Sequence, residues 1–320
     1  MRTIAIDLGG TIIKLALLVD GSVVDIIFMD ADSKSGLKYT LPLLETQINN
    51  ILHLNKIDGS DLDGIGLAFP GLVDYQRGKV ISTNQKYDDA LQMDISLWFT
   101  QKWNVPFFMD NDSRLATIGE WKYGLGLQFS NIVMMTIGTG IGTGVVFEGE
   151  IIRGKHFQAG SLGGHFIVDY NGPLCSCGNR GCVESLSSSF FLPTIITNNT
   201  KLSVEFRQLT SGMDFKQLFS LASARNNDAI IIRDHCLKVW SAAVVNYIHA
   251  YDPELVIIGG GVMNSKDIIL PYIQQYVKDF AWCPSHKVKI VSSILGDDAA
   301  LLGIEHCLLN LLNEKNAIIL

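Results

Sequence analysis

The chain repeats one pattern of strands and turns, and this repeat restricts its fold more than any other feature of the sequence. Residues 3–29 read as a strand, a Gly/Thr turn, a second strand, an Asp20-Gly21 turn and a third strand. Residues 131–152 follow the same order, with Glu148-Gly149 before the third strand. Asp followed by Gly between two apolar runs is a strong β-hairpin signal. The pattern predicts three antiparallel strands at the start of two similar segments, which share no clear sequence identity.

The rest of the chain alternates between predicted strands and helices. Apolar positions recur at helical spacing in residues 39–55, and a buried strand within residues 62–74 ends at the Pro70-Gly71 turn. Residues 187–225 are partly polar and indicate loops and short helices. The other predicted elements are strands at 105–112 and 253–263 and helices at 113–124, 228–251 and 296–312.

Composition and charge exclude several classes of protein. The chain has 320 residues, enough for two domains with separate cores, and 48% of its residues are hydrophobic. Its formal net charge is −7 and it has no Lys/Arg-rich run, which argues against a nucleic-acid surface. The sequence lacks a signal-peptide start, and no apolar stretch reaches the roughly 18 residues that span a bilayer. We therefore expect a cytoplasmic protein with neither a nucleic-acid nor a membrane partner.

Three glycine-rich turns follow predicted strands, and each can approach a phosphate group. They are Asp7-Leu8-Gly9-Gly10-Thr11, residues 138–144 and Gly259-Gly260-Gly261. Glycine lets backbone N–H groups reach phosphate oxygens, Thr11 adds a hydroxyl donor, and the Asp7 carboxylate can hold Mg²⁺. A dinucleotide site is disfavoured at residues 138–144, because that fingerprint opens a helix and a strand follows here. Taken alone, each turn also fits an ordinary connection between buried elements.

Asn111 and Asp112 stand where a predicted strand meets a predicted helix, a place where ligands gather in α/β folds. Phosphoryl transfer to a hydroxyl group needs a carboxylate that accepts the hydroxyl proton. Asp112 suits that role, and Asn111 can hydrogen-bond a neighbouring hydroxyl. An acidic residue before Ser113 also serves as a helix cap. Taken together with the glycine turns, the pattern favours Asp112 as a catalytic base.

Three cysteines and one histidine form a candidate metal site within residues 165–184. His165, Cys175, Cys177 and Cys182 have the spacing H-x9-C-x-C-x4-C. Four N and S ligands suit a closed, structural Zn²⁺ site with tetrahedral geometry. A disulfide across Cys-x-Cys is strained, and a redox Cys-x-x-Cys pair is absent. We expect zinc here, and free thiols are the remaining interpretation.

The two strand–turn–strand segments and the distant glycine site together resemble the actin-like ATPase superfamily. The resemblance implies an α/β fold of two RNase-H-like lobes with ATP in the cleft between them. It implies phosphate contacts from Asp7, Gly9, Gly10 and Thr11 and from Thr139 and Gly140. It also implies adenosine contacts near Gly259, Gly260 and Gly261.

Further motifs resemble the ROK family of bacterial sugar kinases and regulators from about residue 7 to residue 303. The zinc motif "GGHFIVDYNGPLCSCGNRGCVE" is the most specific part. The supporting matches are "DLGGT", "GLAFPGLVD", "MDND", "IGTGIGTGVVFEGEIIRG", "LVIIGGGV" and "GDDAALLG". The resemblance implies ATP- and Mg²⁺-dependent phosphorylation of a hexose or N-acetylhexosamine by a homodimer. It implies one lobe of residues 1–112 and 299–320 and a larger lobe of residues 113–298.

The same resemblance assigns roles to individual residues. It implies that Asp112 is the catalytic base and that one ring nitrogen of His165 binds zinc while the other faces the sugar. The implied sugar contacts are Asn84, Asn111, Asp112, His165 and Glu184.

One departure from the family pattern concerns the sugar site. Kinases of the family usually read Gly-Glu-x-Gly-His, whereas this chain reads "AGSLGGH", with Ser161 or Leu162 at the glutamate position. A lost hydrogen bond to a charged group costs about 1.5–3 kcal/mol of binding. We expect the chemistry to be intact and the sugar specificity to differ.

Two alternatives to a kinase remain. A protein that binds sugar or nucleotide without catalysis would tolerate the missing glutamate. A sugar-sensing regulator would need a helix-turn-helix domain, and we expect none because "AIDLGGT" begins at residue 5.

Overall fold

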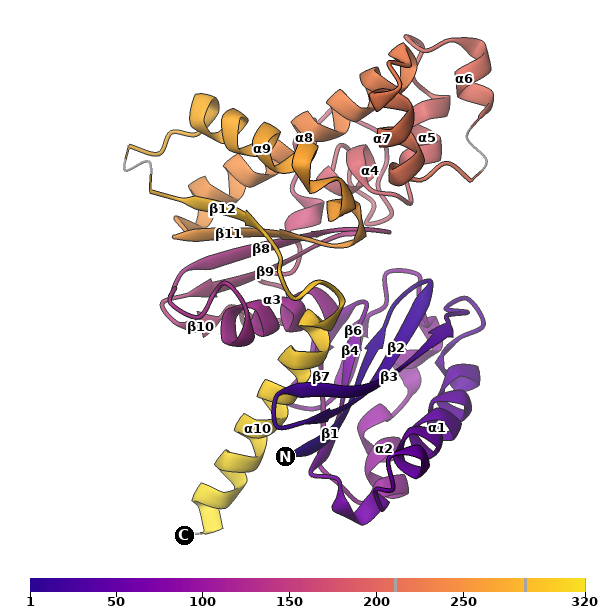
Figure 1. Ribbon diagram of the computed structural model, residues 1–320, viewed down its shortest axis with the longest axis vertical. Helices are drawn as coiled ribbons and strands as arrows, with labels where there is room; N and C mark the ends of the chain where they lie inside the picture. Colours follow the sequence, from indigo (N-terminus) through magenta and orange to yellow (C-terminus); the bar gives the residue numbers. More distant parts are fainter. Residues whose placement is uncertain (210–211, 285–286, 320) are drawn as a thin grey trace. The chain divides into compact units, whose positions relative to one another are not determined.

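The computed structural model describes residues 1–209, 212–284 and 287–319. The chain forms two compact units, each with its own sheet and core (Figure 1). Unit 1 comprises residues 1–127, 153–159 and 297–320, and unit 2 comprises residues 128–152 and 160–296.

Unit 1 is built on a five-stranded sheet in the order β3-β2-β1-β4-β7. The first three strands are antiparallel neighbours, whereas β4 and β7 continue the sheet parallel to β1. A separate hairpin of β5 and β6 follows β4. The bounds are β1 Arg2–Leu8, β2 Ile12–Val19, β3 Ser22–Asp30, β4 Gly64–Phe69, β5 Leu72–Asp74, β6 Lys79–Ser82 and β7 Phe107–Asn111.

Unit 2 contains the same sheet, in the order β10-β9-β8-β11-β12. Strands β8, β9 and β10 are antiparallel, and β11 and β12 run parallel to β8. The bounds are β8 Ile132–Ile137, β9 Ile141–Phe147, β10 Glu150–Ile151, β11 Leu255–Gly259 and β12 Lys289–Ser292. The predicted repeat of strands is confirmed, and it extends to the two parallel strands.

The second turn of each meander has the same backbone conformation. Asp20 and Gly21 have φ values of 49° and 81°, and Glu148 and Gly149 have values of 50° and 77°. Two consecutive positive φ values match the twist of a two-residue hairpin, and this explains the glycine at the second position of each turn and the aspartate at the first position of one. The sequence signal for both hairpins therefore reflects the positive φ values that these turns require.

Helices cover each sheet and bury its apolar side chains. In unit 1, α1 packs its Leu41, Leu44 and Ile48 face into the core with β1, β2 and β4. In unit 2, α8 supplies the fully buried Trp240 to a core that includes β8 and β11. The bounds are α1 Leu37–Leu54, α2 Ile95–Trp103, α3 Asp112–Tyr123, α4 Val183–Ser187, α5 Leu192–Thr197, α6 Val204–Gln208, α7 Phe215–Ser223, α8 Asn227–Tyr251, α9 Lys266–Phe280 and α10 Ala299–Ile319.

The division into units differs from the expected lobe boundary at residue 112. Helix α3 belongs to unit 1 because it packs closely against α10: a Cβ at Gly119 would clash with the Ala299 carbonyl, and one at Gly303 with that of Leu115. The segment Arg153–Ala159 also belongs to unit 1. There, the Arg153 guanidinium lies 2.9 Å from the buried Asp110 carboxylate.

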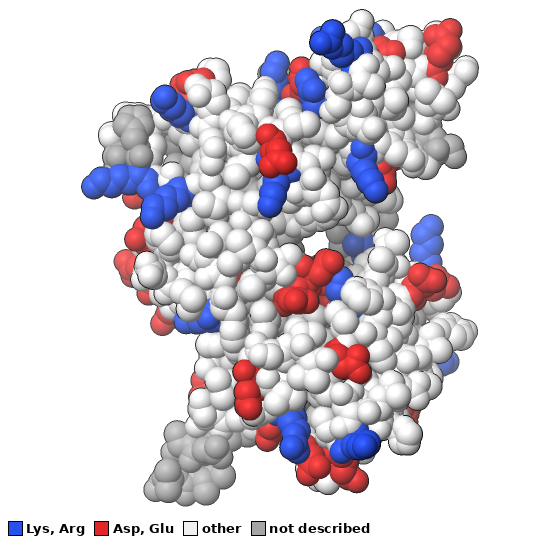
Figure 2. Space-filling model, viewed as in Figure 1, with Lys and Arg blue, Asp and Glu red and all other residues white. Residues whose placement is uncertain are grey.

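Charged side chains of both signs lie on the surface of each unit (Figure 2). On the face of each unit that Figure 2 shows, acidic and basic side chains are interspersed. Among the described residues, no helix is both long and apolar enough to cross a bilayer.

Candidate active site and metal centre

The first glycine-rich turn connects β1 to β2 in unit 1 and is fixed through its carbonyl groups. The Tyr87 hydroxyl donates to the Gly9 carbonyl at 3.1 Å, and the Ser33 hydroxyl donates to that of Gly10 at 3.4 Å. A Cβ at Gly9 would clash with the Ile12 carbonyl, so the turn requires glycine there. Thr11 is exposed at the end of the turn. The turn therefore has a fixed shape and an accessible hydroxyl group.

Asp7 lies at the base of this turn, beside Lys14. Lys14 Nζ lies 3.6 Å from Asp7 Oδ2 and 2.7 Å from Asp297 Oδ1. Burial raises the pKa of Asp7 to about 6; Lys14 opposes this shift, and the charge of Asp112 adds to it. Because burial makes this carboxylate costly to ionise, a nearby cation stabilises its charged form.

Asp112 is the first residue of α3, and it is not the cap of that helix. Asn111 is the cap, because its Oδ1 accepts the Arg114 N–H at 3.1 Å. Asp112 Oδ1 accepts hydrogen bonds from Asn111 Nδ2 at 2.9 Å and from the Ser113 N–H at 2.7 Å. Burial raises the pKa of Asp112, while the charge of Lys86 and these hydrogen bonds act against it. Asp112 is therefore held by one oxygen, and the N-cap of α3 is Asn111.

The segment 83–89 lies against the first turn and contains both Asn84 and Lys86. Asn84, predicted as a sugar contact, has an exposed side chain. Lys86 was not predicted, yet its side chain covers Gly10, since a Cβ there would lie 3.1 Å from Lys86 Nζ. Lys86 also affects the pKa of Asp112. The only sequence signal was its position two residues after Asn84.

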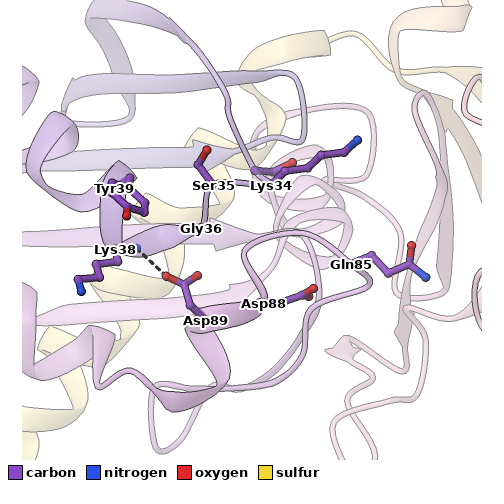
Figure 3. Close-up of a pocket in the computed structure, with 9 residues that line it drawn as sticks. Lys34, Ser35, Gly36, Lys38, Tyr39, Gln85, Asp88 and Asp89 are labelled. Atoms are coloured by element: carbon purple, nitrogen blue, oxygen red, sulfur yellow. Dashed lines mark hydrogen bonds between the residues drawn. The ribbon is translucent and has the colours of Figure 1, made fainter.

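Beside this segment lies a hollow of about 380 Å³, which Lys34, Gln85 and Asp88 help to line (Figure 3). On one side of it, the Asp89 carboxylate points at the first turn of α1 (Figure 3). It accepts the backbone N–H groups of Leu37 at 2.7 Å and Lys38 at 2.8 Å. Asp89 thus accepts two N–H groups at the N-terminus of α1 that have no partner within the helix, and it links segment 83–89 to α1.

The second glycine-rich turn connects β8 to β9 in unit 2 and is fixed by Glu184. Glu184 is 6% exposed, and its Oε2 accepts the Ile141 N–H at 3.0 Å. A Cβ at Gly140 would lie 2.5 Å from the same oxygen, so no larger residue fits. Thr139 is exposed, and its carbonyl accepts the Phe190 N–H at 3.0 Å. The sequence did not indicate this link between the turn and Glu184.

Gly259, Gly260 and Gly261 lie next to the second turn. Gly259 pairs with Thr136 of β8, immediately before that turn. Gly260 has a φ of 90°, and a Cβ there would clash with the backbone of Ile137. A Cβ at Gly261 would meet no atom within 4 Å, so the backbone there borders open space. The structure thus brings two of the three predicted glycine sites together in unit 2.

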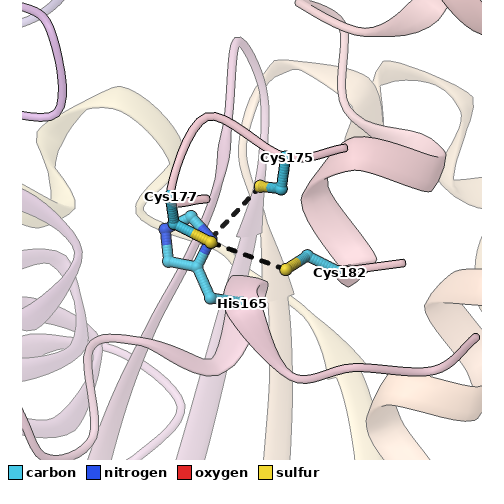
Figure 4. Close-up of side chains that lie close together, drawn as sticks. All are labelled: His165, Cys175, Cys177 and Cys182. Carbon is cyan, nitrogen blue, oxygen red and sulfur yellow. Dashed lines mark hydrogen bonds between the residues drawn. The ribbon is translucent and has the colours of Figure 1, made fainter. Parts of the chain in front are cut away.

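The side chains of His165, Cys175, Cys177 and Cys182 converge in unit 2 (Figure 4). Their four ligand atoms lie within 4.8 Å of one another. Cys177 Sγ lies 3.7 Å from Cys182 Sγ, and Cys175 Sγ lies 3.6 Å from His165 Nδ1. Zn–S bonds of about 2.3 Å in a tetrahedron give S–S distances of roughly 3.8 Å, so the set fits zinc. Burial raises the pKa of Cys175 and Cys182, so thiolates there need a cation.

Ser161 and Leu162 are the two candidates for the position at which the family pattern has a glutamate. Ser161 is buried and Leu162 is partly buried, just before the short helical turn Gly163–His165. The Gly163 N–H donates to the Thr143 hydroxyl at 2.9 Å, which fixes the start of this turn. Neither Ser161 nor Leu162 supplies a carboxylate.

The sequence model of the ROK family matches residues 3–309. The chain belongs to the ROK family. A glucokinase of Thermotoga maritima is 30% identical over 311 residues, which cover 95% of this chain and 96% of that protein. A xylose repressor of Caldicellulosiruptor bescii is 27% identical over 313 residues, or 94% of this chain and 76% of the repressor. The relatives of this chain therefore include a protein named as a kinase and a protein named as a repressor.

A solved ROK structure supports the fold assignment. The ROK glucokinase of Streptomyces griseus, solved with glucose and AMPPNP, superimposes with a TM-score of 0.78. It is 21% identical, and the alignment covers 95% of this chain and 98% of that one. The duplicated sheet of this ROK protein is thus the actin-like ATPase fold, as expected.

Proposed function

We propose that this ROK protein is a kinase that transfers the γ-phosphoryl group of ATP to a hydroxyl group of a hexose or an N-acetylhexosamine. One observation carries the proposal. The carboxylate of Asp112 is held by a single oxygen at the start of α3 and lies in the same unit as the first glycine-rich turn. A regulator that only binds sugar needs no such base.

Asp112 acts as the general base. Within the described residues, every hydrogen bond to its carboxylate reaches Oδ1, so Oδ2 accepts the proton of the sugar hydroxyl. The hydroxyl oxygen forms a bond to the γ-phosphorus as the bond to the bridging oxygen breaks, and ADP leaves with that electron pair. Asn111 positions Asp112 through its Nδ2 group, and its Oδ1 retains one lone pair for a sugar hydroxyl.

The two units hold different parts of the substrates. In unit 1, Gly9, Gly10 and Thr11 contact phosphate, and Asp7 would hold Mg²⁺, which would neutralise phosphate charge. In unit 2, Thr139 and Gly140 contact phosphate, and the backbone of Gly259, Gly260 and Gly261 contacts adenosine. Asn84, His165 and Glu184 contact the sugar.

The zinc ion has a structural role in this proposal. The three thiolates and His165 Nδ1 would complete a tetrahedron, which leaves no open position for a substrate. Because Nδ1 faces the sulfur atoms, the Nε2 nitrogen of His165 is the one that faces the sugar. The loop also carries Glu184, two residues after Cys182, so the metal fixes both sugar contacts.

A protein that binds sugar without catalysis is the second candidate. The observation in its favour is the absence of a carboxylate at Ser161 and Leu162. Phosphoryl transfer does not need that carboxylate, since Asp112 is present, so we infer that its absence changes the choice of sugar.

The experiment is an assay of ADP formation with zinc-containing protein, MgATP and a panel of hexoses, hexosamines and their N-acetyl forms. ADP formation that depends on one or a few of these sugars supports the kinase. ATP binding without turnover for any sugar in the panel would refute it and favour the second candidate. The phosphorylated sugar, identified by mass spectrometry, then gives the substrate class.

A further inference from the structure

The Lys86 side chain lies over the first glycine-rich turn, and neither the predicted site nor the proposed mechanism uses it. A Cβ on Gly10 would lie 2.9 Å from Lys86 Cε and 3.1 Å from Nζ. The ammonium group is also near enough to Asp112 to affect its carboxylate. Lys86 thus lies beside both the phosphate-binding turn and the base of the proposed reaction.

The backbone around Lys86 is held in a conformation that its residue types rarely adopt. Asn84, Gln85 and Tyr87 have φ values of 48°, 62° and 55°, although none of them is glycine. Backbone strain of this kind persists only where surrounding contacts enforce it. The segment with this strained backbone carries Lys86.

Contacts on several sides enforce that conformation. Tyr87 is fully buried; its N–H donates to the Ser33 carbonyl at 2.8 Å and its hydroxyl to Gly9. The Thr83 hydroxyl donates to the Asp88 carboxylate, and Asp89 is fastened to α1 (Figure 3). Lys86 is therefore presented by a rigid segment that is attached to the same turn.

The two lysines near this turn differ in their partners. Lys14 has ion pairs with Asp7 and Asp297, so its charge is already neutralised. Within the described residues, no hydrogen bond or ion pair within 4.0 Å engages the Lys86 ammonium group. A partly buried ammonium without a direct partner, next to a phosphate-binding turn, can accept an anion.

We propose that Lys86 is a catalytic residue whose ammonium group contacts a non-bridging oxygen of the transferred phosphoryl group. This inference rests on the proposed kinase function. Charge spreads over the three equatorial oxygens in the transition state of phosphoryl transfer, and a fixed cation there lowers the barrier. Lys86 remains protonated throughout, so the proton still passes from the sugar hydroxyl to Asp112.

The test compares Lys86→Met, Lys86→Gln and Lys86→Arg with the wild type on the sugar that the panel identifies. We expect the two neutral variants to lose roughly 10²–10³-fold in kcat, as when one transition-state donor is removed, with Kd for the sugar unchanged. We expect Lys86→Arg, which keeps the charge, to recover part of this loss. Lys34→Met, which removes an exposed lysine beside the hollow, should retain the wild-type kcat.

The pH profile separates contact with phosphate from an effect on the base. Lys86 lowers the pKa of Asp112, so its removal raises that pKa and slows the reaction at low pH. If Lys86 acted only in this way, raising the pH would restore the wild-type kcat, and that result would overturn the inference. A deficit that persists on the high-pH plateau supports contact with the phosphoryl group.

The remaining outcomes are equally decisive. A neutral variant within about threefold of the wild-type kcat on the plateau shows that Lys86 is dispensable while the kinase function stands. A wild type that phosphorylates no sugar removes the proposed function and this inference together. Thermal unfolding of each variant identifies any loss that comes from misfolding, and the Gln variant then replaces the Met variant.

Discussion

The two glycine-rich turns close equivalent hairpins in two sheets of identical strand order, yet different side chains surround them. The turn of unit 1 has Asp7, Lys14, Lys86 and Asp112 nearby, and neutral hydroxyl groups fix its carbonyls. The turn of unit 2 is fixed by the carboxylate of Glu184 and by the backbone N–H groups of Ser189 and Phe190.

This difference indicates how a duplicated scaffold becomes asymmetric. Both units have the hairpins and the parallel strands, which fix the backbone around each turn. The side chains near the two turns differ, and in our proposal they give the two units different roles. In our account, unit 1 carries the reacting carboxylate and the cations together with some of the substrate contacts, and unit 2 carries only substrate contacts.

The largest effect is expected at the metal centre of unit 2. Cys182→Ser removes a fully buried ligand, so the protein should lose most of its zinc, about one equivalent per chain, and several kcal/mol of stability. Metal analysis and urea unfolding measure both. Cys283→Ser is the control, because that cysteine lies outside the cluster. Full zinc content in Cys182→Ser would contradict the assignment of this ligand.

The next effect concerns the carboxylate that fixes the second turn. Glu184→Gln weakens the bond to the Ile141 N–H and the proposed sugar contact. We expect the KM for the sugar to rise roughly 10–100-fold, which corresponds to about 1.5–3 kcal/mol for a hydrogen bond to a charged group. The control is the exposed Glu150→Gln. A fall in kcat at unchanged KM would place chemistry in unit 2 and break the comparison.

In unit 1, burial of Asp7 should make stability depend on pH. Its pKa in the folded protein is about 6, above the ordinary 3.8. Protonated Asp7 therefore contributes its full stability below pH 3.8, and this contribution is lost as the pH rises through 6. Asp7→Asn, which is always neutral, should therefore be more stable than the wild type by about 1–3 kcal/mol at pH 7.5.

Urea unfolding at several pH values tests this prediction. The difference between Asp7→Asn and the wild type should shrink as the pH falls from 6 towards 4. Asp61→Asn, at an exposed position, is the control. A less stable Asp7→Asn at pH 7.5 would mean that the ion pair with Lys14 outweighs the cost of burial.

The smallest effect is expected at the hydroxyl that fixes the first turn. Tyr87→Phe removes the donor to the Gly9 carbonyl and should cost about 0.5–1.5 kcal/mol of stability. Tyr39→Phe, at a residue 69% exposed, should cost less. Equal stability of both variants would show that the hydrogen bond to Gly9 does not hold the turn.

Much of the scaffold could be predicted because its signals are local. Asp20-Gly21 and Glu148-Gly149 have positive φ values, so the sequence marks both hairpins directly. Strand β12 was missed because its four residues are short and pair with β11 over a long sequence separation. The boundary of the units differs from the expected one because it depends on the packing of α3 on α10, which are even more distant in sequence.

The site could be predicted only where one motif contains all of its parts. The zinc ligands lie within 18 residues, and their convergence follows from their spacing. Lys86 and the Glu184 contact to Ile141 gave no such signal, since both depend on segments joined by tertiary structure. Asn84, Gln85 and Tyr87 also adopt positive φ values although none of them is glycine, so no glycine in the sequence marks this backbone.

In the proposed mechanism, Asp112 of unit 1 accepts the proton while other residues bind the substrates. The most direct test measures ADP formation and ATP affinity in Asp112→Asn beside the wild type, both with zinc bound. If Asp112 is the base, turnover falls roughly 10²–10⁴-fold while the Kd for ATP stays unchanged. Turnover at the wild-type rate in Asp112→Asn would contradict this mechanism.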